Sequence, residues 1–519
     1  MRKYHFRPCN FIAICILLLF NFQCLLAQDD KPKEDFLGQR IPRGLIKTSE
    51  GLAPGYILYA PPASASVYLL NRQGEVVHEW KGNYEVGSPY LNDDGSLTLM
   101  AIDPDFPVFN EGGEAGRIQK ISWDSKMLWD FEYANEEHHA HHDIAQLPNG
   151  NVLTIAWEAK PYDVVIHAGR NPEFTPADGL WTSEIVEIQP LDKTHGKVVW
   201  EWHIFDHLIQ DFDESKHNYG DVAAHPELLD FNAKSEELPK PISQDSLDVL
   251  IAMEREGRNA TLGNRGSDVY HLNAINYNEE LDQIAFSSYH LGEIFIIDHS
   301  TTTSEAAGHS GGRYGKGGDF LYRWGNPQNY RQGDSTDQKT FNQHDVRWIQ
   351  KGYPGAGNLT LFDNNIPLGR DKLRYSAALE ITPYVGSEGH YELMDNKRYG
   401  PEKPVWKYVA KDTMSFHAPY VSGVQRMKNG NTFINQGPKG RFFEVTPQGD
   451  IVWEFLNPFR GNIHKPNGDP VSMQGWIYSS FRCNFIPEDH PALKGKTLVP
   501  LNPQPPSFTL PPKEKEKSK

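Results

Sequence analysis

The chain has 519 residues and a formal net charge of −17, because 68 Asp and Glu residues outnumber 51 Lys and Arg residues. A surface this acidic repels phosphate backbones, so we exclude nucleic acid as a partner. After residue 27 the only cysteine is Cys483, which excludes an internal disulfide and requires a large apolar core instead.

The first 27 residues have the pattern of an export signal. A basic start with Arg2, Lys3 and Arg7 precedes an apolar run at residues 11–20, and Ala27 ends a plausible cleavage site. We therefore expect a signal peptide over residues 1–27 and a periplasmic or secreted protein, with a retained membrane anchor as the alternative. No later apolar stretch has the length of a membrane span. Residues 28–52, which are polar, are expected to form an N-terminal lead.

A short segment with aromatic rings two residues apart recurs six times between residues 53 and 488. An alternation of this kind is typical of a half-buried strand. The tryptophans of successive copies lie 49 residues apart (Trp80 to Trp129) and 47 residues apart (Trp406 to Trp453), which is the length of a four-stranded blade. The copies are His78-Glu79-Trp80, Trp129-Asp130-Phe131, Trp200-Glu201-Trp202, Tyr322-Arg323-Trp324, Trp406-Lys407-Tyr408 and Trp453-Glu454-Phe455.

These repeats predict an all-β fold, a six-bladed β-propeller over residues 53–488. A β-sandwich with unrelated tryptophan positions is the alternative. The N-terminal lead would close the ring by adding a strand to the last blade.

Two regions depart from the repeat. Residues 203–266 predict a partly helical insertion on one face of the ring, with a helix near residues 246–256, in the usual position of a lid. Residues 489–519, rich in Pro and Lys, are expected to be a disordered tail. The glycine-rich run at residues 308–318 is not a phosphate-binding loop, because Gly317 follows Lys316 where Ser or Thr is needed.

Three histidines occupy one position of the repeat. His142, His271 and His344 lie just ahead of predicted innermost strands, and each is followed seven residues later by Asn149, Asn278 or Lys351, so they should converge at one mouth of the central channel. In the last repeat this position is Ser422, and His417 lies five residues earlier. The alternative for each is a structural or surface histidine.

Residues 137–143 contain four histidines and two carboxylates, and such side chains can bind zinc or copper. Neighbours along a strand face opposite sides, so only two or three could converge, and we predict no metal and no cofactor. Arg370 follows a predicted strand and turn that would deliver it beside the histidines as part of an anion site. The alternative is a surface ion pair of Arg370 with Asp363 or Asp371.

Four motifs together resemble the bacterial arylsulfate sulfotransferases, over most of residues 53–488. They are Asp268-Val269-Tyr270-His271-Leu272-Asn273, Gln343-His344-Asp345, Phe362-Asp363-Asn364-Asn365 leading to Arg370, and Ser422-Gly423-Val424-Gln425-Arg426 followed by Asn429-Gly430-Asn431.

The resemblance implies transfer of a sulfuryl group from a phenolic sulfate ester to a phenol, without the nucleotide donor PAPS, by a ping-pong route through a sulfated histidine. The partners would be small aromatic sulfates and phenols, with a homo-oligomer left open. His271, His344 and Arg370 would bind and stabilise the anion, and His417 would be the nucleophile. Contacts to the substrate would come from His142, Asn273 and Arg426.

Two features of better-known members of that family are missing. Residues 28–52 are too short for their N-terminal β-sandwich domain, and Cys483 has no partner for their disulfide. Two other interpretations stay open. One is a non-catalytic ligand-binding propeller. The other is a quinoprotein-type periplasmic dehydrogenase, because the sequence of residues 196–200 is similar to the tryptophan-docking motif of those enzymes.

Overall fold

The computed structural model describes residues 33–34, 40–103, 108–109, 111–233, 238–253, 256–257, 259–369, 373–386, 389–462 and 477–508. It divides into two units, one of residues 44–508 and a smaller one of residues 1–43 with 509–519. In the smaller unit β1 (Lys33–Glu34) pairs antiparallel with β2 (Arg40–Ile41). The predicted signal peptide and Arg370 lie outside the described residues.

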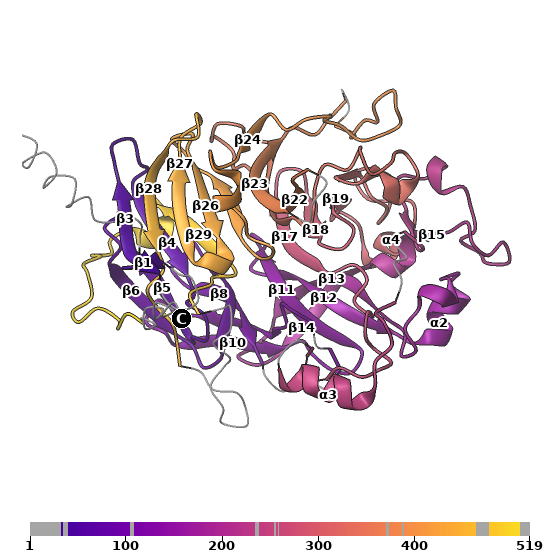
Figure 1. Ribbon diagram of the computed structural model, residues 1–519, viewed down its shortest axis with the longest axis horizontal. Coiled ribbons are helices and arrows are strands. Elements are labelled where there is room, and N and C mark those ends of the chain that lie inside the picture. The colour runs from indigo at the N-terminus through magenta and orange to yellow at the C-terminus, as the bar shows by residue number, and fades with distance from the viewer. Residues whose placement is uncertain are drawn as a thin grey trace, which may run out of the picture. The chain divides into compact units, whose positions relative to one another are not determined.

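Six antiparallel sheets surround a common centre in the larger unit, and their innermost strands contact one another in a ring (Figure 1). This confirms the predicted six-bladed propeller. From inside to outside, blade 1 consists of β29 (Cys483–Pro487), β4 (Gly55–Tyr59), β5 (Ser66–Leu70) and β6 (Val76–Lys81). Blade 2 consists of β7 (Glu85–Leu91), β8 (Leu97–Ile102), β9 (Gly116–Ile121) and β10 (Met127–Glu132). Blade 3 consists of β11 (His138–Gln146), β12 (Val152–Lys160), β13 (Leu180–Pro190) and β14 (Gly196–His203).

Blades 4 and 5 continue the same order, and blade 6 carries a fifth strand on its outside. Blade 4 consists of β17 (Leu272–Asn278), β18 (Gln283–Ser288), β19 (Glu293–Asp298) and β20 (Tyr322–Trp324). Blade 5 consists of β21 (His344–Trp348), β22 (Leu359–Pro367), β23 (Arg374–Ile381) and β24 (Trp406–Tyr408). Blade 6 consists of β25 (Gly423–Arg426), β26 (Thr432–Gln436), β27 (Arg441–Val445), β28 (Ile451–Leu456) and β3 (Gly44–Thr48).

All six aromatic pairs lie on the fourth strand of a blade, and their position has a physical reason. In blades 2 to 6 one tryptophan indole N–H of the pair donates, at 2.7–3.1 Å, to a backbone carbonyl in the connection between the third and fourth strands of the next blade. In blade 1 this bond is made by His78 Nε2 to Trp123 O at 3.0 Å, which accounts for a histidine in the first copy. The repeated pair therefore joins each blade to its neighbour.

Both ends of the larger unit close the ring. β3 pairs antiparallel with β28, with Trp453 opposite Thr48. β29 pairs with β4 as the innermost strand of blade 1, with Cys483 opposite Tyr59. A strand from the N-terminal lead thus extends the last blade, and a strand near the C-terminal end completes the first.

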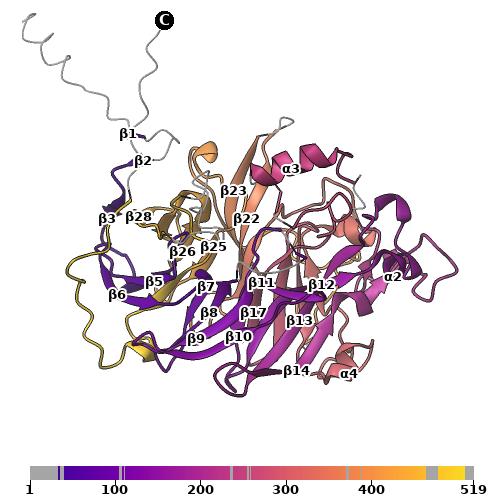
Figure 2. The ribbon, with the colours of Figure 1, turned by 90° about the horizontal axis from the view of Figure 1, so that it is seen from below.

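The insertion at residues 203–266 begins with η2 (Ile204–His207) and the parallel pair β15 (Leu208–Ile209) and β16 (Leu229–Asp230), with η3 (Val222–Ala224) between them. It ends with α3 (Gln244–Ala252). In Figure 2, α3 lies on the opposite side of the ring from α4 (Thr303–Ala306), and α4 packs against β14 where the insertion starts. The insertion is therefore not confined to one face, contrary to expectation.

The remaining helical elements are short turns in the loops. They are α2 (Tyr162–His167), η1 (Pro172–Phe174), η4 (Pro327–Tyr330), η5 (Thr413–Ser415), η6 (Gly437–Lys439) and η7 (Pro491–Leu493). Among the described residues, no helix combines the length and the apolar character needed to cross a membrane.

The expectation of disorder after residue 488 is wrong for residues 489–508. Leu501 N donates to Val76 O at 2.8 Å, Phe508 N donates to Pro458 O at 2.7 Å, and Gln504 forms side-chain bonds to both backbone groups of Val76. A proline-rich segment needs few backbone partners of its own, so these contacts suffice to hold it against blades 1 and 6.

His299 links blade 3 to blade 4 through two carboxylates. Its Nδ1 lies 2.8 Å from Asp282 Oδ1 and its Nε2 lies 3.0 Å from Glu187 Oε2. Burial opposes the charged form, but the bonds to Glu187 and Asp282 outweigh it and raise the pKa of His299. Both ring nitrogens can then donate.

We predict that His299→Gln lowers the free energy of unfolding by about 2 kcal/mol near pH 6. A raised folded-state pKa gives stability that is complete below the unfolded pKa and is lost as pH rises through the folded value. The difference between wild type and variant in urea unfolding should therefore shrink from pH 6 to pH 9. A difference that stays constant over this range would contradict the prediction.

Candidate active site

A cavity of about 840 Å³ opens where the innermost strands begin, and the predicted histidines meet in its wall. His142 comes from β11, His271 directly precedes β17, and His344 begins β21. The ring centroids of His142 and His271 lie 4.6 Å apart, and Tyr289 lies 5.4 Å from His271 and 5.6 Å from His344. The sequence spacing thus identified neighbours in three successive blades.

A repeated bulge turns these side chains toward the cavity. The strand register shifts at residues 141–144, 272–274 and 344–347, and positive φ angles occur at His142 (59°), His271 (48°) and Asp345 (60°). Ser422, at the corresponding position of blade 6, has φ 91°. Bulges of this kind re-aim a side chain at the end of a strand and are common next to active sites.

His271 forms a dyad with Asp268. The Nδ1 of His271 lies 2.5 Å from Asp268 Oδ2, and both side chains are largely buried. Burial opposes the imidazolium, but the charge of Asp268 and its hydrogen bond outweigh burial and raise the pKa of His271. Because Nδ1–H is held by the carboxylate, Nε2 is the nitrogen that can exchange a proton with a ligand.

His344 has both ring nitrogens engaged by the protein. Asn364 Nδ2 donates to the carbonyls of Ala418 and Val421, so its Oδ1 accepts from His344 Nδ1–H at 2.9 Å. His344 Nε2 accepts from Val421 N–H at 3.1 Å. Burial lowers the pKa of His344 to about 3, so this ring is neutral. It lines the cavity but has no lone pair to offer a ligand.

His142 is paired with His141 through their Nδ1 atoms at 2.7 Å, and the His141 ring stacks on Trp157 at 4.1 Å. Burial and the charges of neighbouring histidines lower the pKa of His142 well below its ordinary value. A neutral imidazole therefore lies in the wall, next to His271.

His417 lies in the loop before β25, and it does not line the cavity, whereas Tyr420 and Val421 of the same loop do. Asn365 Nδ2 donates to Pro419 O, which fixes the amide, and Asn365 Oδ1 then accepts from His417 Nε2–H at 3.1 Å. Burial, and then the charges of Lys439 and Arg374, lower the pKa of His417. It is a neutral imidazole with its lone pair on Nδ1, beside two cations.

Carboxylates line another part of the cavity wall. Glu85, Glu111 and Glu114 all line it, and burial and the charge of Asp268 raise the pKa of Glu111 to about 7. Asp268, His271 and His290 also have ligand atoms within 4.8 Å of one another, which is the spacing of a metal site. The expectation that the site uses no metal or cofactor stays a prediction.

Arg482 is a buried residue at the centre that the sequence did not identify. Its guanidinium lies 2.9 Å from Asp143 Oδ2 and 3.2 Å from Asp345 Oδ1, and it donates to the carbonyls of Asn273 and Ser422. One cation thus contacts the innermost strands of blades 3, 4 and 5 and the residue that precedes the innermost strand of blade 6. Burial is the largest cause of the lowered pKa of His142 and His344, and the charge of Arg482 lowers both further.

Two residues that were predicted to contact the substrate, Arg426 and Asn273, do not line this cavity. Arg426 lies at the far end of β25, where it pairs with Glu380 and stacks over Trp406 at 4.9 Å. Asn273 is fully buried, donates to Gln343 O at 2.8 Å and accepts from Ser287 Oγ at 2.5 Å. Both side chains join neighbouring strands or blades and do not line the cavity.

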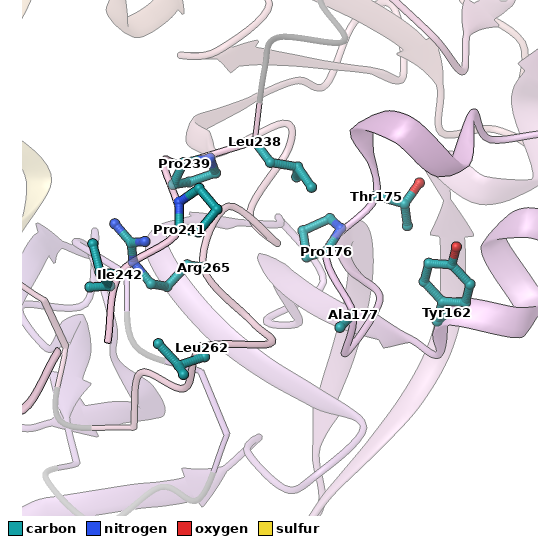
Figure 3. Close-up of a pocket in the computed structure, with 10 residues that line it drawn as sticks. All are labelled: Tyr162, Thr175, Pro176, Ala177, Leu238, Pro239, Pro241, Ile242, Leu262 and Arg265. Atoms are coloured by element: carbon teal, nitrogen blue, oxygen red, sulfur yellow. The ribbon is translucent and has the colours of Figure 1, made fainter. Parts of the chain in front are cut away.

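A second hollow, of about 610 Å³, lies between the α2–η1 region and the insertion (Figure 3). Apolar side chains and prolines dominate it, and Arg265, its one charged residue, is bonded to Glu256 at 3.1 Å. It lacks the imidazole cluster of the cavity. The residues drawn are Tyr162, Thr175, Pro176, Ala177, Leu238, Pro239, Pro241, Ile242, Leu262 and Arg265.

Solved structures that are similar to this chain are distant from it. A protein of unknown function from Bacteroides caccae has 11% identity over 78% of this chain and 94% of its own, with a TM-score of 0.39. Virginiamycin B lyase from Staphylococcus aureus has 10% identity over 80% and 90%, with a TM-score of 0.34. A putative 6-phosphogluconolactonase from Bacteroides fragilis has 10% identity over 84% and 99%, also at 0.34.

A search of curated proteins finds no match to the chain. The family model described as Arylsulfotransferase (ASST) matches residues 117–455. This range contains His142, His271, His344 and His417, all of blades 3 to 5, most of blade 6 and the two outer strands of blade 2. The chain therefore belongs to the arylsulfotransferase (ASST) family.

Proposed function

We propose that this protein transfers a sulfuryl group from a phenolic sulfate ester to a phenol through a sulfated histidine, without PAPS. The observation that carries the proposal is a pair of imidazoles with opposite pKa shifts, in two segments that contact Tyr289. His271 contacts its ring, and His417 lies two residues before Pro419, whose carbonyl accepts from the Tyr289 hydroxyl at 3.4 Å.

The nucleophile we propose is His417. A nucleophilic imidazole must be neutral, and the pKa of His417 is lowered by burial, Lys439 and Arg374. The same two cations suit the anionic oxygens of a sulfate ester. His344 is unsuitable, because both of its nitrogens are bonded to the protein.

His271 is suited to proton transfer. Its pKa is raised by Asp268, so the imidazolium can give its Nε2 proton to the departing phenolate while Nδ1 of His417 forms the N–S bond and the ester O–S bond breaks. In the second half the neutral His271 takes the proton of the acceptor phenol, whose oxygen attacks sulfur and releases His417.

The cavity wall suits aromatic substrates. Tyr289, Tyr420 and Phe481 line it together with Met253, which the insertion contributes after α3. Rings of this kind can stack on an aryl group. We also propose that the protein acts after export, as its first 27 residues indicate, and that residues 53–488 form the catalytic domain.

The test is release of 4-nitrophenol from 4-nitrophenyl sulfate by the purified protein, with and without added phenol. We expect release that depends on phenol, with formation of phenyl sulfate in equal amount. Release that does not need phenol would identify a sulfatase instead. No release with any phenolic acceptor would favour the non-catalytic binding propeller.

A further inference from the structure

A second cluster of imidazole and carboxylate groups lies apart from the cavity, at the outer edge of blades 3 and 4. It consists of His207 in η2, His309 after α4 and Asp319 before β20, and we call it the His207–His309–Asp319 site. Nδ1 of His207 and Nδ1 of His309 each lie 2.8 Å from the same atom, Asp319 Oδ1. Two ring nitrogens thus converge on one carboxylate oxygen.

The surroundings of His207 determine which of its nitrogens carries the proton. The side chain is fully buried, and its Nε2 lies 2.8 Å from Ala306 O. A backbone carbonyl only accepts, so Nε2 carries a hydrogen and a neutral ring has its lone pair on Nδ1. That lone pair then faces the carboxylate oxygen of Asp319. Two acceptors at this distance need a positive charge between them, which is either a proton on Nδ1 or a metal ion.

The same arrangement is the usual one around a protein-bound metal ion. A metal-ligating histidine commonly donates its other ring N–H to a backbone carbonyl, which fixes the tautomer and the ring orientation. Zinc–nitrogen and zinc–oxygen bonds of about 2.1 Å put tetrahedral ligand atoms about 3.4 Å apart, so binding would move each nitrogen away from the carboxylate oxygen, from 2.8 Å now, by roughly half an ångström. The Trp202 ring stacks on His207 at 5.4 Å and an angle of 6°, which holds it in this orientation.

The glycine-rich run at residues 308–318 explains how the ligands are brought together. A Cβ on Gly318 would lie 2.0 Å from Ala306 O and 2.6 Å from His207 Nε2, so a larger residue would disrupt the site. Gly317 has φ 56° and a Cβ there would lie 2.3 Å from Gly308 O. The loop therefore folds back tightly and presents His309 and Asp319 to His207.

The site has an open side. His309 is 61% exposed in its side chain, and it lines a hollow of about 540 Å³ together with His217, His225 and Asp206. A fourth ligand, either water or a solvent anion, can approach from there. Two imidazoles and one carboxylate with an open position suit a borderline divalent ion.

We propose that the His207–His309–Asp319 site binds a divalent transition-metal ion of the zinc class. The ion would join the start of the insertion, in η2, to the loop between β19 and β20 of blade 4. It would serve the fold, since these residues do not line the cavity, and the proposal does not depend on the sulfotransferase reaction.

The experiment uses untagged, full-length protein freed of metal by a chelator and titrated with Co²⁺, whose tetrahedral complexes absorb in the visible. We expect one equivalent to bind with d–d bands of tetrahedral intensity, and Zn²⁺ to displace it and raise the thermal midpoint. His309→Ala should weaken Co²⁺ binding at least about 100-fold, and this exposed side chain is not needed for folding.

His195→Ala is the matched control, because His195 is also an exposed histidine bonded to an aspartate, Asp192, at 2.9 Å. It should bind Co²⁺ as wild type does. Equal Co²⁺ binding by wild type and His309→Ala, or no rise of the thermal midpoint with Zn²⁺ in wild type, would overturn the proposal.

Discussion

His417→Ala should reduce the phenol-dependent release of 4-nitrophenol from 4-nitrophenyl sulfate by at least about a thousandfold. The variant keeps the cavity, since His417 is not in its wall, but loses the nitrogen that would accept the sulfuryl group. The effect should appear in kcat as well as in kcat/KM, because both half-reactions pass through this residue. Steady-state rates at saturating donor measure it.

The controls separate loss of the nucleophile from loss of structure. His195→Ala, a substitution of an exposed histidine, should leave the rate unchanged, and far-ultraviolet circular dichroism should match for all variants. Wild type incubated with donor alone should gain the mass of one sulfuryl group, and His417→Ala should not. If His417→Ala stays active, the nucleophile is another histidine. His271 is then next, because His344 has both ring nitrogens bonded.

The sequence predicted those parts of the molecule that repeat. The aromatic pairs on the fourth strands were visible because each blade makes an equivalent bond to the next, in blades 2 to 6 from an indole N–H to a carbonyl in the connection between the third and fourth strands. The positions of His142, His271 and His344 were visible for a similar reason, since each lies at or next to the bulge of an innermost strand. Residues at the same position of the sequence repeat lie at the same position of successive blades, so they become neighbours around the centre of the ring.

Residues with a single occurrence were harder to predict. In the sequence, Arg426 lies only four residues after Ser422, which occupies the position of the histidines in the last repeat. Four residues span the innermost strand, however, so the Arg426 side chain lies at the other end of the channel, beside Glu380. Arg482 has partners 339 residues away in sequence, and only the closure of the ring by β29 brings it to the centre. The sequence feature that could have indicated a central cation is the pair Asp143 and Asp345, which directly follow His142 and His344. Two acidic side chains at equivalent positions require a cation between them.

Arg482→Met should be among the most destabilising substitutions in the chain, with a loss of roughly 3–5 kcal/mol in the free energy of unfolding. Arg482 is fully buried, and its removal leaves Asp143 and Asp345 without their shared cation in a site that water does not reach. Burial already raises the pKa of Asp143, with Arg482 opposing that rise, so the variant should lose further stability as pH increases and Asp143 ionises. Urea unfolding at pH 5 and pH 8 measures both effects.

Arg331→Met is the matched control, because Arg331 also bridges two aspartates, Asp211 and Asp230, but is 47% exposed. Its loss should cost less than about 1 kcal/mol. Adding Asp143→Asn to Arg482→Met should restore part of the stability, since the uncompensated charge is then removed. Equal costs for Arg331→Met and Arg482→Met would mean that the central guanidinium is not what joins the inner ends of the blades. A double variant no more stable than Arg482→Met would show that the lost hydrogen bonds to Asn273 and Ser422, and not the charge, account for the effect.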